Sequence, residues 1–387
     1  MNSRIVVAPD SFKGSAAADA VARAIAEGWQ HVRPADEIVL RPMADGGEGT
    51  VDAFLAAVPG ARERRVVVDG PDGRPVSARW ALLPASADAP GGTAVVEVAQ
   101  TSGLGLLAAK LPLAAHTRGL GQAIGAVLDE GVSRVLVGLG GSATTDGGAG
   151  ALVALGARFT SRAGVDVADG NAGLAAIQAV DLSGLRPLPE GGVVLLTDVR
   201  SPLLGERGAA RVFGPQKGAS PEDVELMDRN LAHFVDLLSE HAPEAHRLSS
   251  RPGAGAAGGT GFGLTLWGAT ITAGADEVAA QLGLPESVAH ADLVITGEGR
   301  YDEQTGEGKV AAHVAEVARD AGVPVALVAG LVTIEPAGFT DRAELTSLAG
   351  SAEASVADTP RWARRAGEVL ATRWRGNPGD TPGHGTR

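Results

Sequence analysis

The chain has 387 residues, 44% of them hydrophobic but only 3% aromatic, so its core must be built mainly from Ala, Val, Leu and Ile. The net charge of −13 gives no general attraction to nucleic acid or to anionic membranes. The absence of cysteine excludes disulfides, a thiol nucleophile and a Cys-based zinc site. No signal-peptide pattern precedes the first apolar run, and no run reaches the roughly 18 residues of a membrane span, so we expect a cytoplasmic protein.

The N-terminal part alternates strand-like and helical patterns. In chain order, the pattern predicts a strand at 4–8, a helix at 16–29, a strand at 37–42 and a helix at 50–57. The first helix is indicated by Val21, Ile25 and Trp29, which are spaced four apart on one face. A strand–helix–strand unit of this kind has parallel strands and binds ligands at their carboxyl ends.

The middle of the chain opens with a predicted hairpin, in which 65–69 and 76–83 alternate in polarity around a Gly-Pro-Asp-Gly turn. Further elements are expected as strands at 94–98, 134–138 and 193–197 and as helices at 119–130 and 221–240. Ser220, followed by Pro221, is a good N-cap for the last of these helices.

From about residue 290 the strand–helix rhythm returns. The predicted elements are strands at 291–296, 323–328 and 344–348 and helices at 308–321 and 361–373. The simplest α/β architecture makes residues 1–62 plus 272–375 one discontinuous, doubly wound, flavodoxin-like parallel-sheet domain. Residues 63–271 are then an inserted second α/β domain, and 376–387 a disordered tail. A linear split into two domains is the competing interpretation.

Glycine, 55 of 387 residues, is about twice its ordinary ~7% share, and it clusters after the apolar runs. The first strand is followed by Asp10, Ser11 and Lys13 before a helix, a combination that suits an anionic ligand. The second is followed by Asp45 and Glu48 among three glycines, which could hold a metal next to phosphate. Plain capped turns are the alternative at both places.

Two loops in the middle of the chain carry the same kind of chemistry. Residues 138–150 contain six glycines, three hydroxyls and one acid, a composition that packing alone explains poorly. Asp198 stands at the carboxyl end of a strand, where a base, a Mg²⁺ ligand or a helix cap is common. Lys217 lies in a Gly-Pro-Gln-Lys-Gly loop, where a solvated lysine is the more common case.

The C-terminal loops are less uniform. The glycine run at 252–261 does not follow a strand, so it resembles a dinucleotide fingerprint only superficially, and helix packing would explain it. Residues 295–309 combine several acids with Arg300 and Lys309, which could clamp a carboxylate and face a phosphate. Glu303 stands where a Walker A motif needs glycine. These residues together indicate an α/β enzyme acting on a small anion.

The chain resembles the type I glycerate kinases of bacteria over roughly residues 4–373. The segments that carry the resemblance occur in the family's order: APDSFKGS, PMADGGEGT, VEVAQTSGL, LVGLGGSATTDGGAGAL, TDVRSPLLG, FGPQKGA, GAGAAGG and TGEGRYDEQTGEGK. Three places depart from the family pattern: Thr145 stands where Asn is frequent, Arg200-Ser201 where Asp-Asn is frequent, and Gln122 where Glu is frequent. These departures bear on the substrate more than on the reaction class.

The resemblance implies two α/β domains with an active site in the cleft, and transfer of a phosphoryl group from ATP to D-glycerate with Mg²⁺. Asp198 or Asp146 would accept the hydroxyl proton, Asp45 would help to hold Mg²⁺, and Lys13 and Arg300 would neutralise anionic groups. Further substrate contacts are expected from Asp10, Ser11, Ser142 and Thr144. Phosphates would lie against Gly140, Gly141, Gly147, Gly297, Gly299 and Lys309.

The family resemblance favours 2-phosphoglycerate over 3-phosphoglycerate as the product. A nicotinamide-dependent dehydrogenase would need a Gly-x-Gly-x-x-Gly after the first strand, which residues 9–15 lack. A non-catalytic sugar-acid sensor would be expected to lose its loop acids, whereas Asp45, Asp146, Asp198 and Asp302 are all present. A kinase of the same family with a related hydroxy acid as acceptor remains the third alternative.

Overall fold

The computed structural model describes residues 2–302 and 310–376. The chain forms two compact units: unit 1 comprises the residues up to Asp45 and from Ala275 onward, and unit 2 comprises Gly46–Gly274. The sequence placed the first boundary after residue 62. In the structure, helix α2 (Thr50–Ala57) packs on strands of unit 2, so the change of unit comes earlier. The predicted tail lies outside the described residues from 377 onward.

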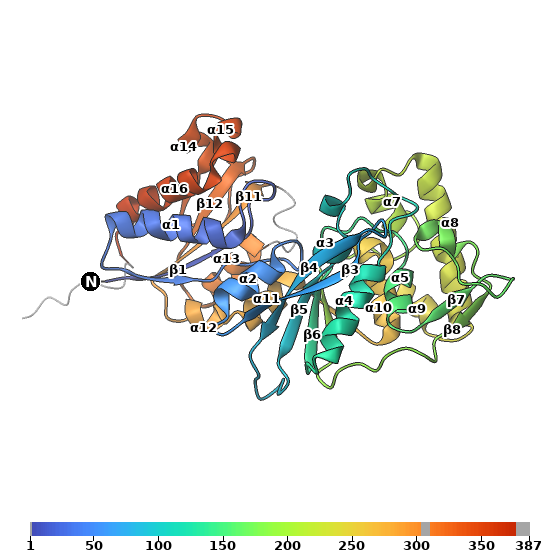
Figure 1. The fold of residues 1–387 in the computed structure, drawn as a ribbon. Helices are drawn as coiled ribbons and strands as arrows, with labels where there is room; N and C mark the ends of the chain where they lie inside the picture. The colour runs from blue at the N-terminus through green and yellow to red at the C-terminus, as the bar shows by residue number, and fades with distance from the viewer. Residues whose placement is uncertain (1, 303–309, 377–387) are drawn as a thin grey trace, which may run out of the picture. The chain divides into compact units, whose positions relative to one another are not determined.

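Unit 1 is a five-stranded sheet with helices packed against it (Figure 1). Its elements are β1 (Arg4–Pro9), α1 (Ala18–Val32), β2 (Glu37–Leu40), α11 (Gly274–Gln281), α12 (Leu284–Val288), β11 (Leu293–Tyr301), α13 (Val310–Asp320), β12 (Val325–Val332), β13 (Asp341–Glu344), α14 (Leu345–Ala349), α15 (Ala352–Ala357) and α16 (Thr359–Arg373). The order is β13-β12-β11-β1-β2, with every neighbouring pair parallel. This is the doubly wound sheet expected from the sequence.

One predicted strand of unit 1 is wrong. Residues 344–348 were expected to form a strand, but β13 ends at Glu344 and α14 begins at Leu345. The apolar residues that suggested a strand, Leu345 and Leu348, instead pack into the core from one side of a short helix. A helix of five residues has too few turns to show its period in the sequence.

Helices α1 and α16 run side by side in unit 1 (Figure 1). They approach closely because each has a glycine at the crossing. A Cβ atom on Gly28 would lie 1.9 Å from the carbonyl oxygen of Arg364, and one on Gly367 would lie 2.2 Å from that of Ile25. Trp29, also fully buried at this crossing, donates its indole N–H to Asp36.

Unit 2 contains a six-stranded mixed sheet and a small second sheet. Its elements are α2 (given above), β3 (Arg62–Asp69), β4 (Pro75–Leu83), β5 (Thr93–Glu97), α3 (Val98–Ser102), η1 (Leu104–Leu106), α4 (Arg118–Asp129), β6 (Arg134–Gly138), α5 (Ala149–Ala154), β7 (Arg158–Thr160), α6 (Asn171–Leu174), β8 (Ala179–Asp181), β9 (Val193–Leu196), α7 (Ala209–Phe213), η2 (Pro215–Lys217), α8 (Pro221–Ser239), α9 (Ala245–Ser249), α10 (Ala256–Trp267) and β10 (Thr270–Thr272). The order β10-β9-β6-β5-β4-β3 is parallel up to β5 and antiparallel beyond it.

The hairpin and the helix cap predicted for unit 2 are confirmed. Strands β3 and β4 form the predicted hairpin, with Asp69 opposite Pro75. Ser220 caps α8 by accepting from the Asp223 N–H, and Asp223 accepts from the Ser220 N–H in return.

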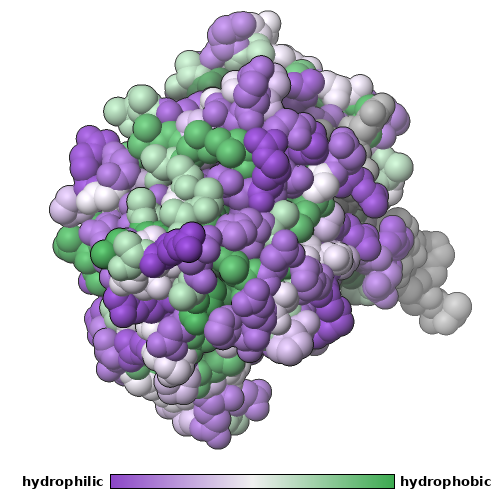
Figure 2. Space-filling model, turned by 90° about the vertical axis from the view of Figure 1, so that its right-hand side faces the viewer, coloured by the Kyte–Doolittle hydropathy of each residue, from purple (hydrophilic) through white to green (hydrophobic). Residues whose placement is uncertain are grey.

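On the face shown in Figure 2, hydrophobic residues form small groups among hydrophilic ones. No helix in the described part of the chain has the length and apolar character needed to cross a bilayer.

We predict that G28A destabilises the protein. The added methyl group would push α1 away from the Arg364 carbonyl, and overpacking of this kind costs about 1–3 kcal/mol. Gly105, where a Cβ would meet nothing within 4 Å, provides the control variant G105A. Thermal unfolding followed by circular dichroism should show a lower midpoint for G28A than for G105A, and equal midpoints would contradict the packing argument.

Candidate active site

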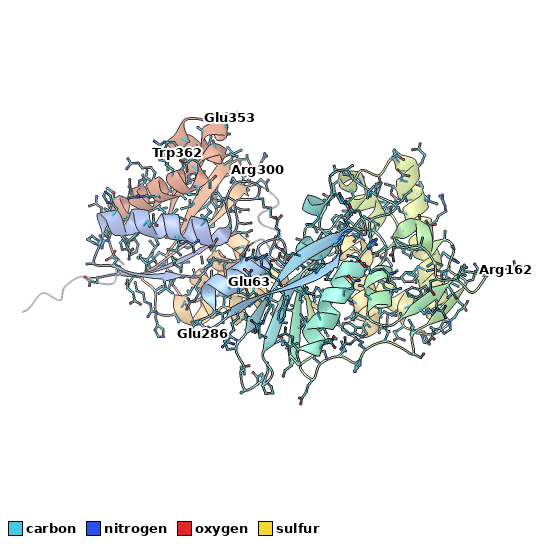
Figure 3. The ribbon with its side chains drawn as sticks, viewed as in Figure 1. Glu63, Arg162, Glu286, Arg300, Glu353 and Trp362 are labelled. Atoms are coloured by element: carbon cyan, nitrogen blue, oxygen red, sulfur yellow. The ribbon has the colours of Figure 1, made fainter. Side chains whose placement is uncertain are left out.

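A pocket of about 400 Å³ lies within unit 1, at the carboxyl edge of its parallel sheet. Its residues come from the segment after β1, the end of β11, the end of β12 and helices α14 to α16. The lining comprises Asp10, Ser11, Phe12, Lys13, Ser15, Asp45, Glu298, Gly299, Arg300, Asp302, Gly330, Leu331, Thr346, Ala352, Ser355, Val356 and Thr359. Figure 3 shows Arg300 near the end of β11, in the neighbourhood of the helix that carries Glu353. Acids and cations line one part of the pocket, while small and apolar side chains line the rest.

The acids of this pocket perturb one another. Burial and, after it, the negative charge of Asp45 raise the pKa of the Asp10 carboxyl to about 7, while the hydrogen bond from the N–H of Ser11 opposes the shift. The Nζ atom of Lys13 lies 3.5 Å from a carboxylate oxygen of Asp45, whose charge raises the pKa of Lys13. Glu298, 6% exposed, adds a further acid to the same wall. A cation bound here would therefore relieve the repulsion between carboxylates.

Arg300 and its neighbours lie on a strand rather than in a loop. β11 continues to Tyr301, so Gly297, Gly299 and Arg300 are strand residues. A Cβ on Gly297 would lie 2.2 Å from the Val328 carbonyl oxygen, which shows that this glycine permits close strand packing. Gly297 and Gly299, predicted to lie in a phosphate-binding loop, are therefore part of the strand itself. Lys309 lies outside the described residues.

In unit 2, Asp146 is fully buried and holds its loop together. Its two oxygens accept hydrogen bonds from the N–H and hydroxyl of Thr117 and from the N–H groups of Gly148 and Gly150, at 2.8–3.2 Å. These donors belong to the starts of α4 and α5. Four donors therefore satisfy the oxygens of this buried side chain. This environment favours a structural role for Asp146 over the proton-accepting role expected from the sequence.

Two more residues that were predicted to contact ligands, Thr144 and Gly147, pack in the same loop as Asp146. Thr144 is fully buried, and its hydroxyl lies 3.4 Å from the Ala257 carbonyl oxygen. Gly147 donates its N–H to the Gly258 carbonyl, and a Cβ on it would press against Leu231 and Phe234. The structure therefore places Thr144 and Gly147 inside unit 2, where they pack against the chain around Ala257.

The glycine run at 252–261 explains why this loop can be so compact. Ala257 has φ 52° and Gly258 has φ 68°, both in the left-handed region. A Cβ on Gly258 would lie 1.9 Å from the Thr144 carbonyl oxygen. The run thus brings backbone against backbone, which agrees with the packing interpretation.

Other predicted residues of unit 2 differ in exposure and lie at one edge of its sheet. Gly141 is exposed with φ 76°, and Ser142 follows it at 7% exposure. Gly140 donates its N–H to the Gly46 carbonyl and lies against Gly47. Asp198, just beyond the end of β9, is half-buried and accepts from the Gly274 N–H at 2.9 Å. These groups share the carboxyl edge of the parallel strands of unit 2.

Two buried ionisable residues of unit 2 were missed or misjudged. Glu97, at the end of β5, accepts from the Val51 N–H at the start of α2, and burial raises its pKa to about 7. Its place directly after an apolar strand was the available signal. Lys217, expected to be solvated, is 2% exposed, and its burial lowers its pKa to about 7. Nothing in its local sequence distinguishes it from a surface lysine.

Both units are α/β folds with acids and cations at the carboxyl ends of parallel strands. This arrangement is typical of enzymes that act on small polar molecules. Residues 5–375 match the sequence profile of the glycerate kinase family. The chain is 43% identical over 336 residues to a glycerate 2-kinase of Escherichia coli, covering 85% of this chain and 86% of that one. It is 42% identical to a glycerate kinase of Bacillus subtilis, with 85% of each chain covered. The chain therefore belongs to the glycerate kinase family.

A solved structure agrees with this membership. The crystal structure of a protein from Salmonella typhimurium that carries the name glycerate kinase 2 superposes with a TM-score of 0.82. The two chains are 37% identical, and the match covers 96% of this chain and 97% of that one. Within residues 2–302 and 310–376, no group of three or more His, Asp or Glu side chains is arranged to hold a metal ion.

We predict that D146N lowers the stability of the protein markedly, because an amide would turn a donor toward groups that are themselves donors. Leaving a buried group unsatisfied costs about 1–3 kcal/mol, and more when it is charged. D198N, which keeps an oxygen for the Gly274 N–H, is the matched control. Urea unfolding should separate the two variants. A stable D146N that has lost activity would restore the proton-accepting role.

We predict a pH-dependent stability difference between D10N and the wild type. The pKa of Asp10 in the folded protein, about 7, lies above its ordinary value of 3.8. Its contribution to stability is therefore complete below about pH 4 and is lost as the pH rises through 7. The stability of D10N relative to the wild type should thus increase between pH 5 and 8.5 in thermal melts. A difference that does not change with pH would contradict the raised pKa.

Proposed function

We propose that the protein transfers the γ-phosphoryl group of ATP to D-glycerate and forms 2-phosphoglycerate. The observation that carries the proposal is the pocket of unit 1, where Asp10, Asp45 and Glu298 gather with Lys13 and Arg300. A phosphorylated nucleotide and a small acid are the ligands that need such a combination of carboxylates and cations. The names of the relatives favour glycerate as the acceptor, and the Escherichia coli relative favours the 2-position.

Mg²⁺ fits this pocket by the chemistry of its donors. It prefers carboxylate oxygens and is commonly held by one or two carboxylates together with substrate phosphates. Asp45 and Asp10 line the same pocket, and burial together with the charge of Asp45 raises the pKa of Asp10. A divalent cation would relieve the repulsion between the two carboxylates. Bound there with ATP, Mg²⁺ would neutralise charge on the phosphates.

The chain's own residues supply positioning and electrostatic stabilisation, which account for most of the catalysis of phosphoryl transfer. Lys13 and Arg300 neutralise anionic oxygens of the ligands that enter the pocket, and Ser11 donates a hydrogen bond there. Lys13 is three-quarters exposed, so it can reorient toward a ligand at little cost. In unit 2, Asp198 accepts the proton of the attacking hydroxyl, because its half-buried carboxylate stands beyond a strand end with one oxygen anchored by Gly274.

The direct test is release of ADP from Mg-ATP in the presence of D-glycerate, with L-glycerate and tartronate as comparison acceptors. Phosphorus NMR of the product distinguishes the 2- from the 3-phosphate. We expect turnover with D-glycerate and formation of the 2-phosphate. Absence of turnover with every acceptor, in a folded sample that binds ATP, would leave a kinase with another substrate or a non-catalytic binder.

We predict that D198N lowers kcat by at least about 100-fold, the range that general bases contribute. Its melting temperature should stay close to that of the wild type, because Asn keeps the oxygen that accepts from Gly274. D88N, which changes an exposed aspartate of the same unit, controls for the loss of one negative charge. Turnover of D198N at the wild-type rate would remove Asp198 as the base.

A further inference from the structure

The buried ammonium of Lys217 lies against the glycine-rich loop after β6. Its Nζ atom donates to the hydroxyl of Ser142 at 3.0 Å and to the carbonyl of Thr144. The side chain comes from η2, a turn 75 residues away in the sequence from Ser142. Burying an ammonium group carries a large desolvation cost, so a lysine kept at this place indicates more than the filling of space.

The hydrogen bond from Lys217 fixes the direction of the Ser142 hydroxyl. In its protonated form the Lys217 ammonium can only donate, so the Ser142 oxygen accepts and the proton of Ser142 points elsewhere. In the described part of the chain, the Ser142 hydroxyl has Lys217 as its hydrogen-bond partner and no acceptor for that proton. Ser142 directly follows the exposed Gly141. Its proton is therefore available to a ligand that approaches this loop.

A second hydroxyl, that of Ser102, lies on the segment next to Ser142 and has no hydrogen-bond partner in the described part of the chain. Ser102 is fully buried, and within residues 2–302 and 310–376 its hydroxyl makes no hydrogen bond, although its carbonyl accepts from the Ala143 N–H at 2.8 Å. Gly103 and Ser142 are joined by an isolated β-bridge. Buried hydroxyl groups normally have partners, so two without an acceptor on adjoining segments indicate that a ligand supplies it.

We propose that Lys217 is a positioning residue that holds the Ser142 hydroxyl as a hydrogen-bond donor to an oxyanion of the substrate. The inference rests on the proposed function and extends it by naming how unit 2 recognises an anion. The oxyanion is either the carboxylate of glycerate or a phosphoryl oxygen of ATP. When protonated, Lys217 also places a positive charge next to the Ser142 hydroxyl, which favours an anion over a neutral group as the ligand.

The test is a double-mutant cycle with S142A, K217M and the variant that combines them. Steady-state kinetics gives KM and kcat, and calorimetry gives the affinities for D-glycerate and for ATP. K110M is the matched control, because Lys110 is exposed and lies against Gly218 of the same turn. Thermal unfolding of every variant separates loss of fold from loss of binding.

We expect S142A and K217M each to weaken binding of one substrate by about 10-fold, the effect of a charge-assisted hydrogen bond. K217M introduced into S142A should then add less than about a 3-fold change. Weakened D-glycerate binding would identify the carboxylate as the partner, and weakened ATP binding would identify a phosphoryl oxygen. K110M should match the wild type.

Unchanged affinity of S142A for both substrates would overturn the inference, and this variant removes only a hydroxyl, so it decides the matter even if K217M does not fold. An effect of K217M that is just as large in the S142A background would show that Lys217 acts by some other means and would also overturn it. Failure of the proposed function is visible separately, as absent turnover of the wild type. Weakened binding of ATP by S142A would then still support the role of Lys217.

Discussion

The organisation of unit 2 depends on the hydrogen bonds that the buried carboxylate of Asp146 accepts. Asp146 is fully buried and ties the beginning of α4, through Thr117, to the turn that begins α5, through Gly148 and Gly150. Buried charge is tolerated only when it is well paired with donors. The four donors that Asp146 recruits therefore fix the path of the chain between β6 and α5. Asp146 also acts on the buried Lys217. Burial lowers the pKa of Lys217, and the charge of Asp146 opposes that effect.

Glycine makes this arrangement sterically feasible. Gly258 lets the Thr144 carbonyl approach to a distance that no side chain would permit, and Gly140 does the same for Gly47. These residues were attractive as phosphate-binding candidates because a bare backbone serves both purposes. In this fold many of them allow backbone to pack on backbone, whereas Gly141 is exposed and Gly299 lines the pocket of unit 1.

The sequence predicted the parallel sheets, the hairpin of β3 and β4 and the cap of α8, because each depends on local periodicity or on one turn. It also predicted the acids and cations that line the pocket of unit 1, since Asp10, Lys13 and Asp45 follow predicted strands directly. It did not separate Asp146 from Asp198, although both are single acids after a strand. Their difference lies in partners such as Thr117 and Gly274, which are distant in the sequence. Lys217 was misjudged for the same reason.

The path of the chain through the two units constrains the order of folding. In unit 1 the strand β1 pairs with the central strand β11, placing Ile5 opposite Leu293, whereas the strands of unit 2 lie in one uninterrupted segment. On the ribosome the first 45 residues, which contain β1 and its neighbour β2, leave the exit tunnel long before β11 exists, and closing so long a loop carries an entropic cost. Unit 2 can complete its sheet in that interval. A mutation that slows the folding of unit 2 would then prolong the time for which the β11-facing edge of the apolar strand β1 stays open to aggregation.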